Sequence, residues 1–322
     1  MDTIVRLKDI VDPSIQEIFD ETKDQLSAKQ QYKELGYMDY SPSVPAPKFS
    51  STSGLSVAQL TLEGTPYSQE NRTQGYDVQM TVKKYTKCVT WTEELYHWIM
   101  NGNKEKAMEF REDTQAVTQS LYERIDTEAA KPVYLAHGVT FQTGGDGVAL
   151  AAYNHPSTEP GVSTQRNIPL STETHMPLSY TSLVMARDRM TRYYDLKGVQ
   201  LQKPKNLELW IAVENLDNAE RILRSTLLPG TNYNDQSSLR NTITIRVLDW
   251  IPSAYSTYWA LVDKSRVTRG CRMVWGWQPR LEQESDYSKG TFYRDGSVYF
   301  CSGFRDWHWG WFTKGDGSVV AL

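Results

Sequence analysis

The 322-residue sequence has few of the residues that build disulfide frameworks and metal centres. Its three cysteines, Cys88, Cys271 and Cys301, lie far apart, are odd in number and form no CxxC pair. Its five histidines are scattered, without an HExxH or HxH pattern. We therefore expect no disulfide scaffold and no metal site, but reduced structural thiols in a cytoplasmic setting.

The sequence also lacks the signatures of common enzymes. It has no Walker-type phosphate-binding loop and no GxSxG nucleophile elbow. Residues 145–147 (Gly-Asp-Gly) begin a dinucleotide-type pattern, but Leu150 stands where the third glycine belongs. The adjacent Glu93 and Glu94 point in different directions on a helix or strand, so they suit the first turn of a helix better than an acid–base pair. We expect no catalytic residue and no cofactor.

A strong charge of one sign and a long apolar run are absent as well. The 35 Lys and Arg against 39 Asp and Glu give a net charge of −4, whereas a protein that grips nucleic acid normally carries a basic patch or a high pI. A mildly acidic chain can still confine DNA loosely without sequence-specific binding. The N-terminus has no apolar signal-peptide region, and no window approaches the roughly 18 apolar residues of a membrane helix. We predict a soluble chain with no membrane partner.

Aromatic residues, in contrast, are plentiful: the chain has 10 Trp and 19 Tyr. Tyr and Trp bury a large area and keep one polar group, so they are favoured where protein surfaces meet. A Trp-rich core explains the same composition. The length fits one large domain or two closely joined ones.

Residues 1–56 read as an N-terminal arm. Residues 12–13 (Asp-Pro) suit a helix start, apolar residues follow at helical spacing, and Gly36 ends the helix. The rest of the arm is rich in Pro, Ser and Tyr and predicts an extended strap without regular structure. Because this polar arm has no core of its own, we expect a neighbouring subunit to hold it.

Residues 57–91 predict a long β-hairpin that projects as a loop. Residues 57–64 and 76–92 alternate between apolar and polar side chains on either side of a polar tip. Isolated two-stranded ribbons are marginal in water, so this one needs a partner surface.

The remaining chain predicts a spine helix, a compact α+β unit and terminal strands. The helix spans 104–131 and ends at Pro132, with a length of about 40 Å. The unit spans 144–270 and includes a helix capped by Ser179. The other expected elements are strands at 133–141, 207–213, 243–251 and 258–263, a helix at 216–227, and strands throughout 271–322.

This order of elements resembles the major capsid proteins of tailed phages, which have the HK97-like fold, and details resemble the Mu-like major head subunit group. The residues that carry the resemblance are MTVKKYTKCVTWTEELYHW, GDGVALAAYNHP, YYDLKGVQL, the Asp249-Trp250 strand followed by WALVD, and RLEQESDYSKGTFYRDGSVYFCSGFRDWHWGWFTKGD. Each is weak alone, and their order and spacing make the match specific.

The resemblance implies an α+β, HK97-like fold with an N-terminal arm (1–56), an extended loop (57–91), a peripheral domain with the spine helix (92–143, returning at 271–322) and an axial domain (144–270). It implies a major capsid protein that self-assembles as pentamers and hexamers into an icosahedral shell around packaged double-stranded DNA. Scaffolding, portal and decoration or cement proteins would be its partners, and it would reside in the virion after assembly in the host cytoplasm. Because the arm begins almost at Met1, we expect a separate scaffold or none.

In this interpretation the inter-subunit contacts come from the arm and the extended loop. Some members of the family form a covalent Lys–Asn crosslink, but nothing in this sequence supplies the partner geometry for the lysines of the loop. The alternatives are an encapsulin-type nanocompartment shell, a phage tail or baseplate protein, and a hydrolase whose triad assembles from distant residues. The candidate contact residues are Ile15, Ile18, Phe19, Tyr37, Tyr40, Phe49, Tyr67, Arg72, Tyr76, Lys83 and Lys84.

Overall fold

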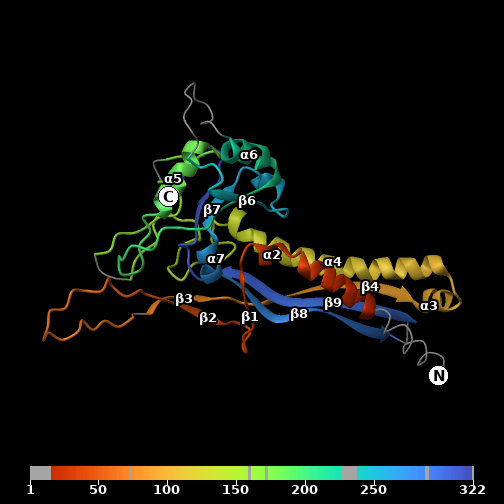
Figure 1. Ribbon diagram of the computed structural model, residues 1–322. Helices are drawn as coiled ribbons and strands as arrows, with labels where there is room; N and C mark the ends of the chain where they lie inside the picture. The colour runs from red at the N-terminus through yellow and green to blue at the C-terminus, as the bar shows by residue number, and fades with distance from the viewer. Residues whose placement is uncertain are drawn as a thin grey trace.

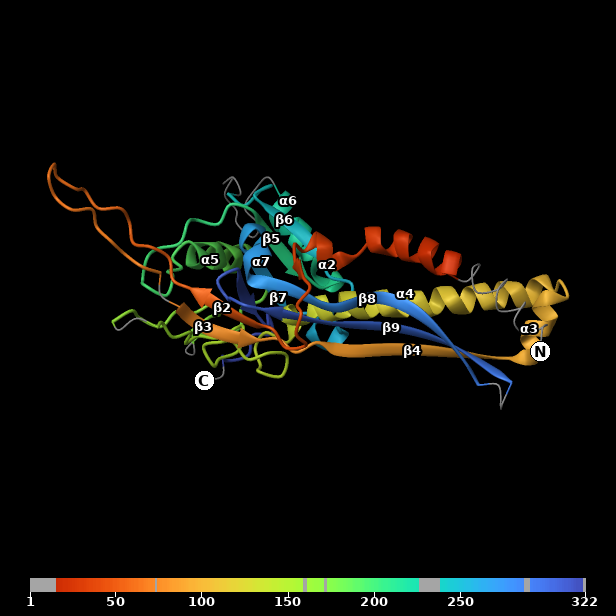
Figure 2. The same cartoon turned by 90° about the horizontal axis from the view of Figure 1, so that it is seen from below.

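The computed structural model places an elongated half beside a compact half, with a long loop projecting from their junction (Figure 1). Turning the molecule by 90° shows the loop and the long helix extending to opposite sides (Figure 2). The structure describes residues 16–72, 74–158, 161–170, 173–225, 238–286 and 290–320.

The elongated half consists of one long helix on a four-stranded sheet. Helix α4 (Lys104–Tyr134) runs along strands β4 (Lys83–Thr92), β8 (Cys271–Asp286) and β9 (Thr291–Phe304). The strand order is β1-β8-β9-β4, in which β1 (Met38–Tyr40) pairs parallel with β8 and the other neighbours pair antiparallel. The predicted spine helix is therefore confirmed.

Pro132 does not end α4 as predicted, but lies in its last turn. A proline inside a helix has no N–H for the carbonyl four residues earlier, here that of Glu128. The hydroxyl of Ser302 on β9 donates to this carbonyl instead, at 2.7 Å. Because the vacated acceptor is satisfied by the neighbouring strand, the helix continues to Tyr134.

The compact half is built on a second sheet with the order β10-β7-β5-β6. Its strands are β5 (Leu207–Ile211), β6 (Ile243–Val247), β7 (Trp259–Asp263) and β10 (Gly310–Thr313). All residues of β5, β7 and β10 are buried, and the core between them holds four tryptophans that are at most 1% exposed. These are Trp210, Trp259, Trp309 and Trp311. The Trp-rich core accounts for a large part of the aromatic content.

Helices cover this sheet and connect it to the elongated half. Helix α5 (Tyr180–Met190) begins at the predicted cap, where Ser179 and Ser182 form a reciprocal capping box. Helices α6 (Leu216–Arg224) and α7 (Lys264–Gly270) follow, with short 3₁₀ turns at Val213–Asn215 and Ser253–Tyr255. The strands predicted at 207–213, 243–251 and 258–263 are confirmed, with shorter bounds.

Two predictions about this region are wrong. The expected strand at 133–141 does not form, because α4 continues to Tyr134 and only turns follow it. The final strand β10 does not lie with β8 and β9, but pairs antiparallel with β7. The chain thus enters the compact half twice, and its last 11 described residues, 310–320, close that half rather than the elongated one.

The N-terminal region packs on its own chain more than predicted. A helix over 16–28 is followed, after a break, by α2 (Gln31–Glu34) and by Gly36 with a φ of 85°. Tyr37 is buried in the core, and its hydroxyl donates to the Ala129 carbonyl at 2.8 Å. The expected helix start at residues 12–13 lies outside the described residues. Phe19 and the residues from about 30 onward therefore anchor the arm on its own subunit.

The predicted β-hairpin over 57–91 is wrong in its pairing. Strand β2 (Lys48–Thr52), in the part of the arm expected to be irregular, pairs antiparallel with β3 (Gln74–Gln79). Residues 53–72 between them contain no strand, and β4 pairs with β9 instead of a hairpin partner. Helix α3 (Glu93–Met100) follows and is capped by Thr92, whose side chain accepts a hydrogen bond from the Leu95 amide. In the described part of the chain, no helix is both long and apolar enough to cross a membrane.

Candidate assembly surface

The most conspicuous unpartnered feature is the loop of residues 53–72, called here the projecting loop (Figures 1 and 2). Val57, Leu60 and Leu62 are 78%, 93% and 71% exposed, and Tyr67 is 86% exposed. Single apolar residues on a surface are ordinary, but such a cluster on one protruding segment marks an interaction site. The projecting loop therefore carries the side chains that its own chain leaves uncovered.

The base of the projecting loop is closed by hydrogen bonds and one ion pair. The amide and hydroxyl of Ser56 donate to the Glu70 carboxylate at 2.7 and 2.5 Å. Lys197, from the turn after α5, donates to Glu70 at 2.7 Å and to the Asn71 carbonyl at 3.1 Å. The hydrogen bonds from Lys197 and Ser56 lower the pKa of Glu70 to about 2. The two limbs of the loop are thus tied together and to the compact half.

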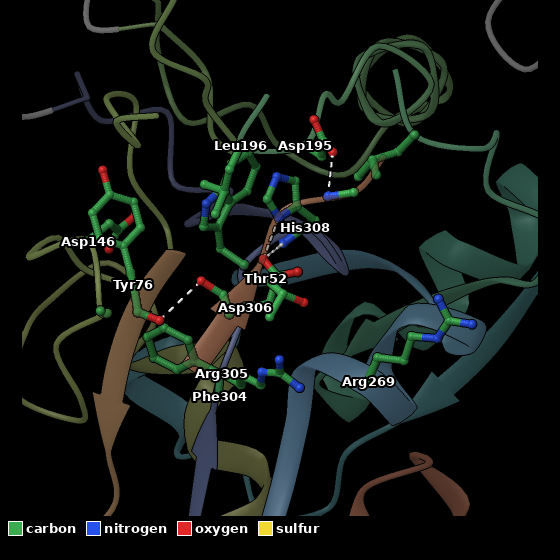
Figure 3. Close-up of a pocket in the computed structure, with 16 residues that line it drawn as sticks. Thr52, Tyr76, Asp146, Asp195, Leu196, Arg269, Phe304, Arg305, Asp306 and His308 are labelled. Carbon is green, nitrogen blue, oxygen red and sulfur yellow. Dashed lines mark hydrogen bonds and ion pairs between the residues drawn. The ribbon is translucent and has the colours of Figure 1, made fainter. Parts of the chain in front are cut away.

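A second attachment is made by Asp195, two residues before Lys197 in the chain and labelled in Figure 3. One of its carboxylate oxygens accepts from the Gly54 amide at 2.8 Å, and the other accepts from the amides of Lys197 and Val199 at 2.9 Å each. A Cβ at position 54 would lie 2.5 Å from the Asp195 oxygen. Glycine at this position leaves the Asp195 carboxylate in place, whereas a side chain there would have to displace it.

Below these anchors lies a cavity of about 300 Å³, lined by Tyr76, Asp146 and residues 304–308 among others (Figure 3). The Trp307 ring stacks between two imidazoles, with centroid distances of 4.2 Å to His155 and 3.8 Å to His308. Each imidazole bonds a carboxylate: His155 contacts Asp146 at 2.7 Å, and His308 contacts Asp306.

The charged groups of this cavity pair with one another. Burial opposes the charge of Asp306, but His308 and the backbone amides of Trp307 and His308 lower its pKa to about 2. The nearby hydroxyl of Ser51 donates to the Tyr76 carbonyl at 3.1 Å, so it is not presented to an imidazole as a nucleophile. Among the residues that the structure describes, no three His, Cys, Asp or Glu side chains are grouped as metal ligands.

The candidate contact residues of the arm fall into two sets. Tyr40 and Phe49 come together, with their rings edge to face at 5.0 Å, and Tyr40 remains 42% exposed. Phe19 and Tyr37 are instead buried within their own chain. Ile18 is half-buried, and Ile15 lies outside the described residues.

The other candidates lie on or near the projecting loop. Tyr67 and Arg72 are exposed on it, and Tyr76 is half-buried at the cavity below its base. Lys83 and Lys84 are exposed on β4, and the ammonium of Lys84 lies 5.8 Å from the centre of the Trp277 ring. The structure therefore does not gather the predicted residues at one point: two of them are buried, and the exposed ones lie on separate segments of the chain.

Sequence reasoning missed the two side chains that orient the loop, Asp195 and Lys197. They lie in the segment YYDLKGVQL, where Gly198 has a φ of 78° and signals a tight turn. Their partners lie more than 120 residues away in the chain, and a local sequence pattern cannot predict such a contact.

Comparison with known proteins gives likeness in structure without likeness in sequence. No protein-family model matches the sequence, and no curated protein matches it. The capsid of the cyanophage P-SCSP1u is similar with a TM-score of 0.53 and 13% identity, covering 88% of this chain and 87% of that chain. A structure from Mycobacterium phage Patience is similar with a TM-score of 0.52 and 11% identity, covering 94% and 89%. A virus-like particle from Pyrococcus furiosus is similar with a TM-score of 0.51 and 6% identity, covering 92% and 98%.

These likenesses extend over nearly the whole chain, on both sides of each comparison. The chain therefore has the α+β, HK97-like fold that the sequence implied. The finer likeness to the Mu-like head subunits stays a prediction.

Proposed function

We propose that this chain is the major capsid protein of a tailed double-stranded DNA phage. The observation that carries the proposal is the projecting loop, with its uncovered apolar side chains, on a fold shared with shell subunits. The loop is fixed at its base and open along its length, which is the arrangement expected of a segment that lies on a neighbouring copy.

The physics of assembly follows from what one subunit leaves exposed. Burying a Leu or Val side chain stabilises a contact by about 1.5–3 kcal/mol, and Val57, Leu60 and Leu62 offer three such side chains per loop. Many modest contacts per subunit add up through avidity. A closed shell results when the same interfaces repeat around symmetry axes, here pentamers and hexamers.

The two halves take different roles in this proposal. The elongated half, with α4, β4, β8 and β9, would form the peripheral domain, and the compact half would form the axial domain near the capsomer axis. Because β10 belongs to the compact sheet, the axial domain would include residues 310–320 as well as 144–270. The proposed contact surface comprises Tyr40, Phe49, Tyr67, Arg72, Lys83 and Lys84, together with the loop side chains.

The proposed partners are further copies of the chain, with scaffolding, portal and decoration or cement proteins. A net charge of −4 supports loose confinement of DNA rather than sequence-specific binding. The site of action would be the virion after assembly in the host cytoplasm, and no enzymatic step is proposed.

A second candidate is a nanocompartment shell, because the virus-like particle from Pyrococcus furiosus is as similar in fold as the phage structures. The two candidates differ in what the shell contains. Nucleic acid inside particles purified from the natural producer supports the phage capsid, whereas a protein cargo supports the nanocompartment.

Electron microscopy of the full-length chain tests the proposal, first expressed alone and then with the products of its genomic neighbours. We expect closed icosahedral shells, or separate pentamers and hexamers. Monomers or dimers under all conditions would contradict the shell function, and open tubes would support a tail protein instead.

A further inference from the structure

The compact half contains a cavity of about 830 Å³ whose charged lining is entirely basic among the described residues. Four cations line it: Arg166 from the loop over 161–170, Arg189 and Arg192 at the end of α5, and Lys197. No described carboxylate is part of the lining. Such a concentration of one charge is unexpected in a chain that is acidic overall.

Arg166 is a largely buried member of this group. Its side chain is only 14% exposed, and its Nη1 is buried without a hydrogen-bond partner among the described residues. Glu173 lies 3.7 Å from this nitrogen, at ion-pair distance but without a hydrogen bond. Burial, and then the charge of Arg189, lower the pKa of the Arg166 guanidinium, and the charge of Glu173 opposes this shift. A buried cation beside another cation is costly unless an anion compensates it.

Two further lining groups, Gln165 and Lys197, are held in place. The Gln165 side chain forms two hydrogen bonds with the Tyr194 backbone, one to its amide and one to its carbonyl, each 2.8 Å long. The Gln165 backbone pairs with that of His155 at 2.8 and 2.9 Å. Lys197 is fixed by Glu70, as described above. This part of the wall is therefore formed before any ligand arrives, as is usual for small-molecule sites.

We propose that this cavity is a phosphate-binding site, with Arg166 and Arg189 as its principal ligands. Guanidinium groups match phosphate oxygens in a bidentate geometry, and such charge-assisted hydrogen bonds are about twice as strong as neutral ones. The volume is that of a small-ligand pocket, which fits a phosphate-bearing ligand better than a folded acidic segment. The ligand could be a free polyphosphate or the phosphodiester backbone of a nucleic acid, because both present the same oxygens.

The test is isothermal titration calorimetry of the full-length chain with sodium tripolyphosphate. We expect saturable binding that weakens as salt rises, and at least about a tenfold loss of affinity in Arg166→Gln and in Arg189→Gln, since each variant removes a charge-assisted hydrogen bond. Arg221→Gln is the matched control, because Arg221 is exposed on α6 and outside the cavity. It should bind tripolyphosphate as the unaltered chain does.

The half-buried Arg189 keeps the test usable if Arg166→Gln fails to fold, and Arg189→Lys should recover part of the affinity because it restores the charge without the planar geometry. Fluorescence anisotropy with a short labelled DNA duplex separates the two ligand sources. Duplex binding with the same losses in the cavity variants identifies the phosphodiester backbone, and tripolyphosphate binding alone identifies a free polyphosphate.

Two results would overturn the proposal. One is that the unaltered chain binds no tripolyphosphate. If, in addition, Arg189→Gln blocks assembly, the cavity is occupied by an acidic segment of a neighbouring subunit instead. The other is an equal loss of affinity in Arg221→Gln, which would mean general attraction to surface charge.

Discussion

The compact sheet and the projecting loop both carry apolar side chains in a regular pattern, yet they have opposite fates. Strand β5 is flanked by β6 and β7, and its residues are all buried. Residues 57–64 alternate as a strand would, but Leu60 among them is 93% exposed and no strand forms. Alternation of apolar and polar side chains therefore shows that a segment can form a strand. The strand itself forms only where the edge of another strand is available for pairing. For the loop, the proposed function assigns that edge or surface to another copy of the chain.

The largest expected effect comes from making the projecting loop polar. We expect the triple variant Val57→Ser, Leu60→Ser and Leu62→Ser to abolish shell formation, because it removes the apolar side chains that a neighbour would cover. The free energy of unfolding should change by less than about 0.5 kcal/mol, since surface substitutions cost little. Electron microscopy and urea unfolding of the unassembled subunit measure the two outcomes.

The control for that experiment is Gln59→Ser with Thr61→Ser, which alters the polar positions of the same segment. These substitutions should leave assembly unchanged. Normal shells from the triple variant would show that the loop is not the contact, and a large loss of subunit stability would show that it belongs to the fold.

The second effect tests the other side of the comparison. Trp210 is fully buried and its indole nitrogen donates to Glu208 at 3.2 Å. We expect Trp210→Ala to lower the free energy of unfolding by about 3–5 kcal/mol, because it removes buried contacts and leaves a cavity. Tyr67→Ala, at an 86% exposed position of the loop, should cost less than about 0.5 kcal/mol. Urea unfolding measures both variants. Similar losses of unfolding free energy would show that the loop is as important to the stability of the subunit as the compact core.

Elements that are stabilised by local signals were predictable from the sequence. The Ser179 cap, the apolar stripe of α4 and the buried run of β5 each appear where expected, because caps and periodicity act within one or two turns. The extension of α4 past Pro132 was not predictable, since it depends on the hydroxyl of Ser302, 174 residues from its acceptor.

The candidate surface was predictable only as a region. The prediction was a projecting loop over residues 57–91, and the structure has one over residues 53–72. Its pairing was not predictable, because β2 pairs with β3 in place of residues 57–64 and register is decided by tertiary packing. The anchoring of the loop by Asp195 depends on a contact 141 residues distant in the chain.

The third effect separates the two regions by pH. His137 and His175 lie in the compact half with ring centres 4.8 Å apart, and burial is the main cause that lowers both pKa values, that of His137 to about 3. Lys314 lowers both further, while Asp316 opposes the shift. The folded state thus stays neutral where the unfolded chain binds protons, so stability falls as the pH drops from about 6.5 towards 3.

This loss amounts to about 1.4 kcal/mol per pH unit for His137, or about 2 kcal/mol at pH 5. Urea unfolding at pH 7 and pH 5 measures it, and His137→Gln should flatten the dependence. At the base of the loop, Glu70 has a pKa of about 2, so its contact with Lys197 should persist at pH 5. An unchanged slope in His137→Gln would assign the acid sensitivity to other groups.

The smallest effect concerns the link between the two regions. Asp195→Ala removes the acceptor of the Gly54 amide and of two further amides in its own turn. Since a hydrogen bond to a charged group contributes about 1.5–3 kcal/mol, local opening at Gly54 should become at least about tenfold more frequent, with little change in global unfolding. Hydrogen exchange of peptides that span residues 50–56 measures this, with Asp188→Ala, an exposed acid on α5, as the control. If exchange at Gly54 is unaltered while shells still form, the loop is oriented by its neighbour in the shell and not by its own subunit. If exchange rises and shells become irregular, the anchor on the compact half sets the direction in which the loop reaches the next copy.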